Sequence, residues 1–310
     1  MQTMDSRRII FVPGKNPKPP PEDHRRLLWR TLLEGVRRSR PDLVDDLARH
    51  PDCFRLVAWT WLYYRRSTDI SRDLPWIDAL INKHGPTAED IEGTRTWQRR
   101  FAHACFVAGD MFPFVIPLLP KTIRMIARET RRYFRNEGGI ALQIRELLKK
   151  ELRPAFAAGD KVLLIGHSLG SVIAYDTLWE LDHEERLAGK VDLFLTLGSP
   201  LGMHYVQRRL RGSDRSGRER YPGNIRRWVN ISSVGDITAL DRKFRDDFGT
   251  MLELGLIEDI EDHSEAIYNF FRSDEGLNVH RSYGYLVNPA VGNVIGDWWQ
   301  LAGGKATRPL

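Results

Sequence analysis

The chain has 310 residues, of which 42% are hydrophobic, and a formal net charge of +6 at pH 7. This length and composition are ample for one large core, and no apolar run is long enough to cross a membrane. Lys and Arg are spread along the chain and form no recognisable nucleic-acid-binding module. We therefore expect a single domain over residues 1–310 that has neither a transmembrane segment nor a nucleic-acid partner. Because the amino-terminal residues hold no signal-peptide core, we expect a cytoplasmic protein.

The first third of the chain predicts alternating strands and helices. Residues 8–12 form a short apolar strand that ends at Pro13-Gly14, and residues 22–36 carry apolar side chains at helical spacing. A second strand is predicted over residues 54–62, which are rich in apolar and aromatic residues. The order strand, helix, strand is typical of a mostly parallel sheet flanked by helices, so the predicted fold class is α/β.

Residues 69–119 depart from this alternation. Short helices are predicted over 73–81 and 97–107, and residues 111–120 follow with three prolines, two phenylalanines and no charge. Proline excludes a regular helix or a central strand in that last stretch. Two interpretations stay open for it, a loop that fills the core or a cap that lines an apolar substrate pocket.

The alternation returns after this insertion. The predicted helices cover residues 121–135, 140–154, 172–181, 244–260 and 289–301, and the predicted strands cover residues 162–165, 191–197, 228–234 and 266–271. Residues 207–221 are rich in Arg, Gly and Ser and predict a solvated loop, with contact to anions or to a membrane surface as the alternative. The acidic residues at 259–262 and the adjacent His263 are interpreted as a solvated helix end rather than a metal site.

The most specific motif lies where an apolar strand meets a helix. Residues 162–165 are apolar, and Gly166-His167-Ser168-Leu169-Gly170 follows them directly. The sequence strand, tight turn, helix around Gly-x-Ser-x-Gly is the context that a nucleophile elbow requires. The turn lifts Ser168 out at the carboxyl end of the strand, where the N–H groups that begin the helix face any oxyanion formed there.

A nucleophilic serine needs a base within hydrogen-bond reach, and the base needs an acid that orients it. The carboxyl ends of parallel strands share one edge of a sheet, so the loops directly after strands are the places to search. Asp236 follows the predicted strand at 228–234, and His280 lies beyond the one at 266–271. The chain therefore offers Ser168, Asp236 and His280, in that order, at one edge.

Each partner has a competitor. Asp241 lies in the same loop as Asp236 but further from the strand end. His263 precedes the predicted last strand at 266–271, which would place it at the opposite edge of the sheet from Ser168. We therefore favour Asp236 and His280.

These residues resemble those of the lipase and esterase branch of the α/β-hydrolase superfamily. The resemblance rests on the Gly-His-Ser-Leu-Gly-Ser motif after an apolar strand, on Leu-Gly-Ser-Pro-Leu-Gly at 197–202 and on Val-His-Arg-Ser-Tyr at 279–283. It implies an α/β-hydrolase fold. From their own composition, we expect residues 69–119 to form a cap or lid insertion within that fold. The resemblance also implies a serine hydrolase that cleaves small or lipid-like carboxylic esters through an acyl-enzyme and needs no metal or organic cofactor.

The same resemblance assigns roles to individual residues. Ser168 would be the nucleophile, Asp236 the acid and His280 the base. The oxyanion hole would use the N–H of Leu169 and an N–H from the loop at Gly14 and Lys15. Apart from the resemblance, the residues expected to line an uncharged substrate pocket are His167, Phe112, Phe114, Leu201 and Met203. The loop after the first strand reads Pro13-Gly14-Lys15-Asn16, whereas many relatives have His-Gly there.

Two alternatives to an esterase stay open. The same three residues serve other acyl chemistry, in a thioesterase, amidase, lactonase or acyltransferase. A protein that keeps the fold without catalysis would instead be a binding protein.

Overall fold

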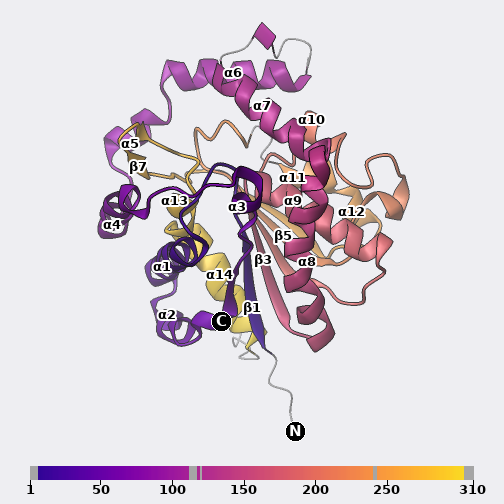
Figure 1. The fold of residues 1–310 in the computed structure, drawn as a ribbon. Coiled ribbons are helices and arrows are strands. Elements are labelled where there is room, and N and C mark those ends of the chain that lie inside the picture. Colours follow the sequence, from indigo (N-terminus) through magenta and orange to yellow (C-terminus); the bar gives the residue numbers. More distant parts are fainter. Residues whose placement is uncertain (1–5, 112–116, 119–120, 240–242, 304–310) are drawn as a thin grey trace.

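The computed structural model describes residues 6–111, 117–118, 121–239 and 243–303 (Figure 1). Its centre is a sheet of six parallel strands in the order β2-β1-β3-β4-β5-β6, beside which lies a small antiparallel pair, β7-β8. The strands are β1 (Arg7–Val12), β2 (Phe54–Leu56), β3 (Lys161–His167), β4 (Val191–Leu197), β5 (Ile225–Ile231), β6 (Asp259–His263), β7 (Arg272–Ser273) and β8 (Gly276–Leu277). The predicted α/β fold with a parallel sheet is confirmed.

Helices cover both faces of the sheet. The described helices are α1 (Pro21–Ser39), α2 (Pro41–Ala48), α3 (Trp59–Tyr64), α4 (Leu74–Asn82), α5 (Ala88–Gly93), α6 (Trp97–Met111), α7 (Lys121–Phe134), α8 (Ile140–Ala158), α9 (Leu169–Trp179), α10 (His204–Gln207), α11 (Phe244–Phe248), α12 (Thr250–Glu253), α13 (Ser282–Leu286) and α14 (Pro289–Ala302). One apolar core joins the sheet to α8, α9 and α11, and the other joins it to α1, α13 and α14. Figure 1 shows these two groups of helices on opposite sides of the strands.

The alternation of side chains along each strand builds these two cores. In β1, Ile9 and Phe11 point to the core beneath α1 and α14, whereas Ile10 and Val12 point to the core beneath α8 and α9. All four side chains are fully buried. A strand buried on both faces is apolar at every position, which is why β1, β3, β4 and most of β5 are visible in the sequence as apolar runs.

The strand order creates a switch point at the carboxyl edge of the sheet. From β1 the chain goes first to β2 on one side and later to β3 on the other side of β1. The loops after β1 and β3 therefore leave the sheet as neighbours. Ligands of open parallel sheets bind at such a point, outside the carboxyl ends of the strands.

The predicted strand over 54–62 is wrong beyond residue 56. The strand β2 ends at Leu56, and the helix α3 begins at Trp59. Trp59 and Tyr63 are one helical turn apart, both are buried, and their rings pack edge to face with centroids 5.6 Å apart. This apolar run therefore packs in the core with helical rather than strand periodicity.

The region after β5 also differs from the prediction. Two short helices, α11 and α12, replace the long helix expected over 244–260, and the polar residues at 259–263 form the edge strand β6 rather than a helix end. The apolar run at 266–271 does not pair with the sheet, although Ile267, Phe270 and Phe271 are buried in the core beneath α1 and α14. His263 consequently lies at the carboxyl end of the last strand, on the edge where Ser168 lies.

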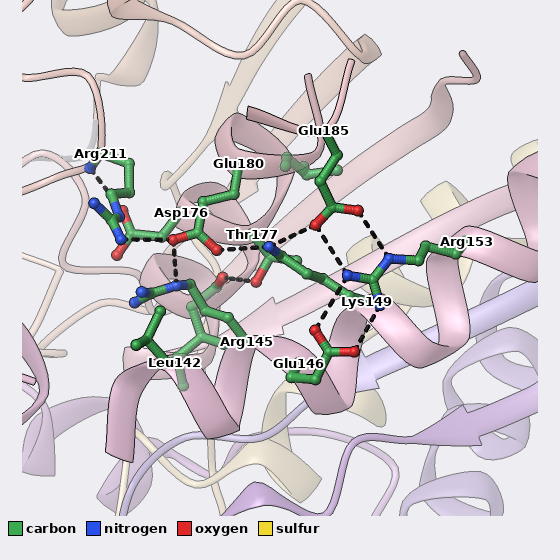
Figure 2. Close-up of polar contacts among 12 residues, drawn as sticks. Leu142, Arg145, Glu146, Lys149, Arg153, Asp176, Thr177, Glu180, Glu185 and Arg211 are labelled. Atoms are coloured by element: carbon green, nitrogen blue, oxygen red, sulfur yellow. Dashed lines mark hydrogen bonds and ion pairs between the residues drawn. The ribbon is translucent and has the colours of Figure 1, made fainter. Parts of the chain in front are cut away.

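A polar network lies between α8 and α9 on one face of the sheet (Figure 2). Glu180 is 1% exposed and pairs with Arg145 at 2.8 Å, Lys149 at 2.9 Å and Arg211 at 2.8 Å. Glu185 continues the network through Lys149 and Arg153. The π-helical turn Glu180–Glu184 at the end of α9 precedes Glu185, and the carboxylates of Glu180 and Glu185 both face cations of α8.

Candidate active site

Ser168 occupies a strained turn between β3 and α9. Its backbone has φ 53° and ψ −129°, a left-handed conformation that residues other than glycine rarely adopt. The Ser168 N–H donates to the carbonyl oxygen of Leu197 at the end of β4, at 3.0 Å. This bond joins the turn to the neighbouring strand and holds the serine at the carboxyl edge of the sheet.

The two motif glycines are required by close backbone contacts. A Cβ on Gly166 would lie 2.6 Å from the Cα of Ser171, and one on Gly170 would clash with the carbonyl oxygen of Val12. The start of α9 therefore packs directly against both β3 and the end of β1. This packing places Ser168 at the switch point of the sheet, as the motif predicted.

Asp236 and His280 meet at the same edge. His280 Nδ1 lies 2.7 Å from Asp236 Oδ2. The Asp236 side chain is completely buried, whereas that of His280 is 28% exposed. A Cβ on Gly198, in the loop after β4, would lie 2.7 Å from Asp236 Oδ2 and 3.1 Å from His280 Nδ1, so this glycine leaves the space in which the pair fits.

Two further residues hold Asp236 and were missed in the sequence. The Tyr285 hydroxyl, on α13, donates to Asp236 Oδ2 at 2.6 Å, and the Thr238 hydroxyl donates to Oδ1 at 2.7 Å. The Thr238 backbone N–H also donates to Oδ1 at 3.0 Å, which closes an Asx-type turn. The spacing Asp-x-Thr is a local signal for Thr238, but nothing in the sequence brings Tyr285 to Asp236.

These partners determine the charge of Asp236. Burial by itself would raise the pKa of this carboxyl group, but the imidazole of His280 and the hydrogen bonds from His280, Tyr285 and Thr238 outweigh it. The net effect holds the pKa of Asp236 well below its usual range. Asp236 is therefore a carboxylate at neutral pH, and the proton between the two residues stays on His280 Nδ1.

His167 holds the segment that carries His280. Its Nε2 donates to the backbone carbonyl oxygen of His280 at 2.8 Å, and the two imidazole rings pack with centroids 4.8 Å apart. Burial, followed by electrostatic interactions with His280 and Lys18, lowers the pKa of His167 well below its ordinary value. His167 is thus neutral. Because it directly precedes Ser168, its hydrogen bond links the serine turn to the backbone of His280.

No hydrogen bond joins Ser168 to His280 among the residues that the structure describes. A Cβ on Gly14 would lie 2.8 Å from Ser168 Cβ and also 2.8 Å from His167 Nδ1. The His167 ring in turn packs on that of His280. Gly14 and His167 therefore border the serine, and His280 adjoins this group through His167. His280 Nδ1 faces Asp236, and its Nε2 lies 3.5 Å from the Thr238 hydroxyl.

The N–H groups predicted for an oxyanion hole lie close to the serine. Leu169 is the first residue of α9, so its N–H has no partner within the helix. The loop after β1 is held by aromatic residues of α3: Trp59 Nε1 donates to the Pro13 carbonyl at 2.7 Å, and the Asn16 N–H donates to the Tyr64 hydroxyl at 3.1 Å. Gly14 and Lys15 lie between these two anchors.

The remaining predicted residues have varied positions. Leu201 is fully buried in the core beneath α8 and α9, Met203 packs half-buried against that core, and the Lys15 ammonium pairs with Glu129 of α7 at 3.2 Å. The predicted pocket residues Phe112 and Phe114, and the competing acid Asp241, lie outside the described residues. His263 is 43% exposed on its side chain and lies 3.5 Å from Glu261, so it is not the histidine that pairs with Asp236.

The segment from α4 to α6 packs on the loops of the site. On α6, Asp110 accepts hydrogen bonds from the backbone N–H groups of His204 and Tyr205, at 2.9 and 2.7 Å. Arg99 of the same helix donates to the carbonyl oxygen of Leu277, at 2.7 Å. Figure 1 shows α6 at the end of the molecule where the carboxyl ends of the strands lie.

The segment also pairs with residues next to His280. Arg281 forms an ion pair with Asp73, and Arg272 pairs with Asp90 at 2.9 Å. The His280 loop is therefore held from the side opposite to His167.

Within the described ranges, no three or more His, Cys, Asp or Glu side chains gather where they would hold a metal ion. None of the helices in those ranges combines the length and the apolar composition that crossing a bilayer requires. No family model, curated protein or solved structure matches the chain.

Proposed function

We propose that this chain is a serine hydrolase with an α/β-hydrolase fold that cleaves carboxylic esters through an acyl-enzyme. One observation carries the proposal: a buried carboxylate binds an imidazole at the carboxyl edge of a parallel sheet, and the same edge holds a serine on a strained strand-to-helix turn at the switch point. Asp236, His280 and Ser168 then have the roles of acid, base and nucleophile.

The first half of the reaction forms the acyl-enzyme. The Nδ1–H of His280 donates a hydrogen bond to Asp236. The Nε2 of His280 accepts the Ser168 hydroxyl proton while Ser168 Oγ attacks the ester carbonyl carbon. The resulting oxyanion accepts hydrogen bonds from the N–H of Leu169 and from the loop at Gly14 and Lys15. His280 then returns the proton to the leaving alcohol, and the acyl group stays on Ser168.

The second half releases the acid. His280 Nε2 takes a proton from water, the hydroxide attacks the acyl carbonyl, and the collapse of the second tetrahedral intermediate regenerates the Ser168 hydroxyl. In this mechanism the Ser168–His280 hydrogen bond forms in the complex with substrate, since such bonds are often long without it. The anchored segment from α4 to α6 serves as a cap that walls the site and holds the His280 loop.

The test is turnover of p-nitrophenyl esters of increasing acyl length, with a thioester and an anilide of the same acyl group for comparison. We expect the esters to be cleaved, apolar acyl groups to be preferred over charged ones, and Ser168→Ala to lower kcat by at least about a thousandfold. Preference for the thioester or anilide would reassign the acyl chemistry. Near-normal ester turnover by folded Ser168→Ala protein would refute the proposal.

A further inference from the structure

The outward face of α6 is apolar, which is unusual for a helix at the surface. Trp97 is 72% exposed, Phe101 57% and Met111 54%, and Ala104 is exposed between them. The separations of four, three and seven residues place all four on one side of a helix with 3.6 residues per turn. Leu118, beyond the end of α6, is 86% exposed.

The opposite face of α6 is anchored to the body of the protein. At 3.6 residues per turn, Arg99 and Asp110 fall on the side away from Trp97 and Phe101. These are the residues that bond to Leu277 and to the start of α10. The apolar stripe is therefore directed away from the protein by polar contacts at both ends of the helix. An exposed apolar face held in this way marks a surface that binds something.

The net positive charge of the protein is concentrated at the same end of the molecule. Residues 94–135 contain nine Lys and Arg but two Asp and Glu, a net charge of +7, whereas the whole chain has +6. Lys and Arg are spread along the chain, as the sequence indicates, but elsewhere acidic residues offset them. Neither acid of this segment neutralises the surface, because Asp110 is buried at α10 and Glu129 pairs with Lys15.

Several arginines at this end are exposed and form no ion pair within the described part of the chain. Arg100 flanks the apolar stripe on α6, and α7 carries Arg124, Arg128 and Arg131. The stretch that joins the two helices, residues 112–120, contains no charged residue. Figure 1 shows α6 at the outer end of the molecule and α7 leading from that end toward α8.

We propose that this surface, formed by the outward face of α6 with Leu118 and the exposed arginines of α7, binds peripherally to anionic lipid membranes. Tryptophan, phenylalanine and aliphatic side chains enter the boundary between headgroups and acyl chains, while arginines bind the anionic headgroups. A second copy of the chain is a poor occupant, because two faces of +7 repel each other. Single-stranded nucleic acid would use the arginines and aromatic rings but leave Met111 and Leu118 in water.

This surface lies over the edge of the sheet that carries Ser168. The helix α6 is bonded both to α10, after β4, and to the loop that precedes His280. A protein bound through this surface would therefore present its candidate active site to the membrane. Membrane binding itself does not depend on the proposed hydrolase activity.

The test measures co-sedimentation of the full chain with vesicles of phosphatidylcholine, with and without phosphatidylserine, at low and high salt. We expect binding to the vesicles with phosphatidylserine that weakens when salt is raised or phosphatidylserine is omitted. Arg124→Gln and Arg128→Gln should each lower the partition coefficient by about fivefold. Arg186→Gln, an exposed arginine outside this surface, is the control and should leave it unchanged.

A matched pair of substitutions tests the apolar stripe. Phe101 and Leu301 are 57% and 59% exposed, but Leu301 lies on α14, far from α6. Phe101→Ser should lower the partition coefficient by about tenfold, and Leu301→Ser should leave it within about twofold. Circular dichroism and thermal unfolding establish that each variant is folded.

Several results would overturn the proposal. They are no binding of the folded wild-type chain to phosphatidylserine vesicles, equal losses in Phe101→Ser and Leu301→Ser, tighter binding to a single-stranded oligonucleotide than to the vesicles, or self-association that Phe101→Ser abolishes. Because the measurement does not use turnover, failure of the hydrolase proposal leaves its outcome unchanged.

Discussion

The protein buries carboxylates in two places and holds them differently. At the carboxyl edge of the sheet, Asp236 is bound by an imidazole and two hydroxyl groups, and the imidazole of His280 remains partly exposed. Between α8 and α9, Glu180 is bound by two arginines and a lysine (Figure 2). In the second place every partner is a cationic side chain that pairs directly with the carboxylate. In the first, the partners are an imidazole and two hydroxyl groups.

The pKa values of two buried aspartates make the contrast sharper. His280 and the hydroxyl donors hold the pKa of Asp236 well below its usual range despite its burial. Asp176 lies beside Glu180, and burial raises its pKa to about 6, because the Arg211 N–H, Arg145 and the Tyr133 hydroxyl compensate only in part. A shifted pKa therefore does not locate an active site by itself. The first region differs from the second in having a partly exposed imidazole bound to its carboxylate, at the sheet edge that carries the strained Ser168.

The largest expected effect separates the two histidines at the carboxyl edge. His280→Ala should lower kcat for ester cleavage by at least about a thousandfold, because the base that activates Ser168 is lost. His263→Ala is the control and should keep most of the activity, since His263 contacts Glu261 rather than Asp236. Steady-state kinetics on both purified proteins decides between them, and the reverse pattern would show that the base has been misassigned.

Exchanging one buried carboxylate in each region tests the contrast between them. Asp236→Asn should lower kcat by about a hundredfold or more with little change in KM, because the Asn amide no longer holds His280 in the correct tautomer. Asp176→Asn should leave kcat within about twofold. A larger loss from Asp241→Asn than from Asp236→Asn would transfer the role of the acid to Asp241.

Each region also offers a tyrosine whose hydroxyl donates to its carboxylate. Tyr285 donates to Asp236 at 2.6 Å, and Tyr133 donates to Asp176 at 2.9 Å. Tyr285→Phe should lower kcat by about tenfold at unchanged KM, because Tyr285 positions the acid without touching the substrate, and the loss is one charge-assisted hydrogen bond. Tyr133→Phe should change only the free energy of unfolding. Equal kinetic effects from the two variants would rule out a positioning role for Tyr285.

The last expected effect is on stability and not on turnover, and it appears only as a pH dependence. The pKa of Asp176 is about 6 in the folded protein and 3.8 ordinarily, so the folded state binds its proton more tightly. The stabilisation from this group is complete below about pH 4 and is lost as pH rises through about 6, on the order of 3 kcal/mol. Asp176→Asn should lack this loss in denaturant unfolding followed across that range. Parallel pH profiles for the two proteins would contradict the assignment.

The sequence revealed the parts of the fold that are buried on both sides. The strands β1, β3, β4 and β5 appear as apolar runs, and the turn at Ser168 is marked by glycines that the close packing requires. The edge strand β6 escaped notice because only Ile260 is buried, while Asp262 accepts hydrogen bonds from the N–H groups that begin α11. The apolar run at 266–271 led to the opposite error, because a strand was predicted there and none pairs with the sheet. Apolar side chains indicate burial and not strand pairing.

The candidate site was predicted in part for the same reason. Asp236 follows the strand β5 as expected, but the strand expected before His280 does not form. The two side chains nevertheless lie 2.7 Å apart. His263 was expected at the opposite edge of the sheet from Ser168. This expectation was wrong, since His263 lies at the carboxyl edge. Tyr285 and the support of His280 by His167 and Arg281 depend on contacts between distant segments, which no local pattern encodes.

The most direct test of the central claim is covalent labelling with a fluorophosphonate, followed by mass spectrometry of the digested protein. The proposed geometry predicts a single adduct on Ser168, rapid in the wild-type protein, absent in Ser168→Ala and strongly slowed in His280→Ala, while His263→Ala is labelled at the wild-type rate. Folded wild-type protein that forms no adduct, or forms it on a residue other than Ser168, would contradict the assignment of Ser168 as an activated nucleophile.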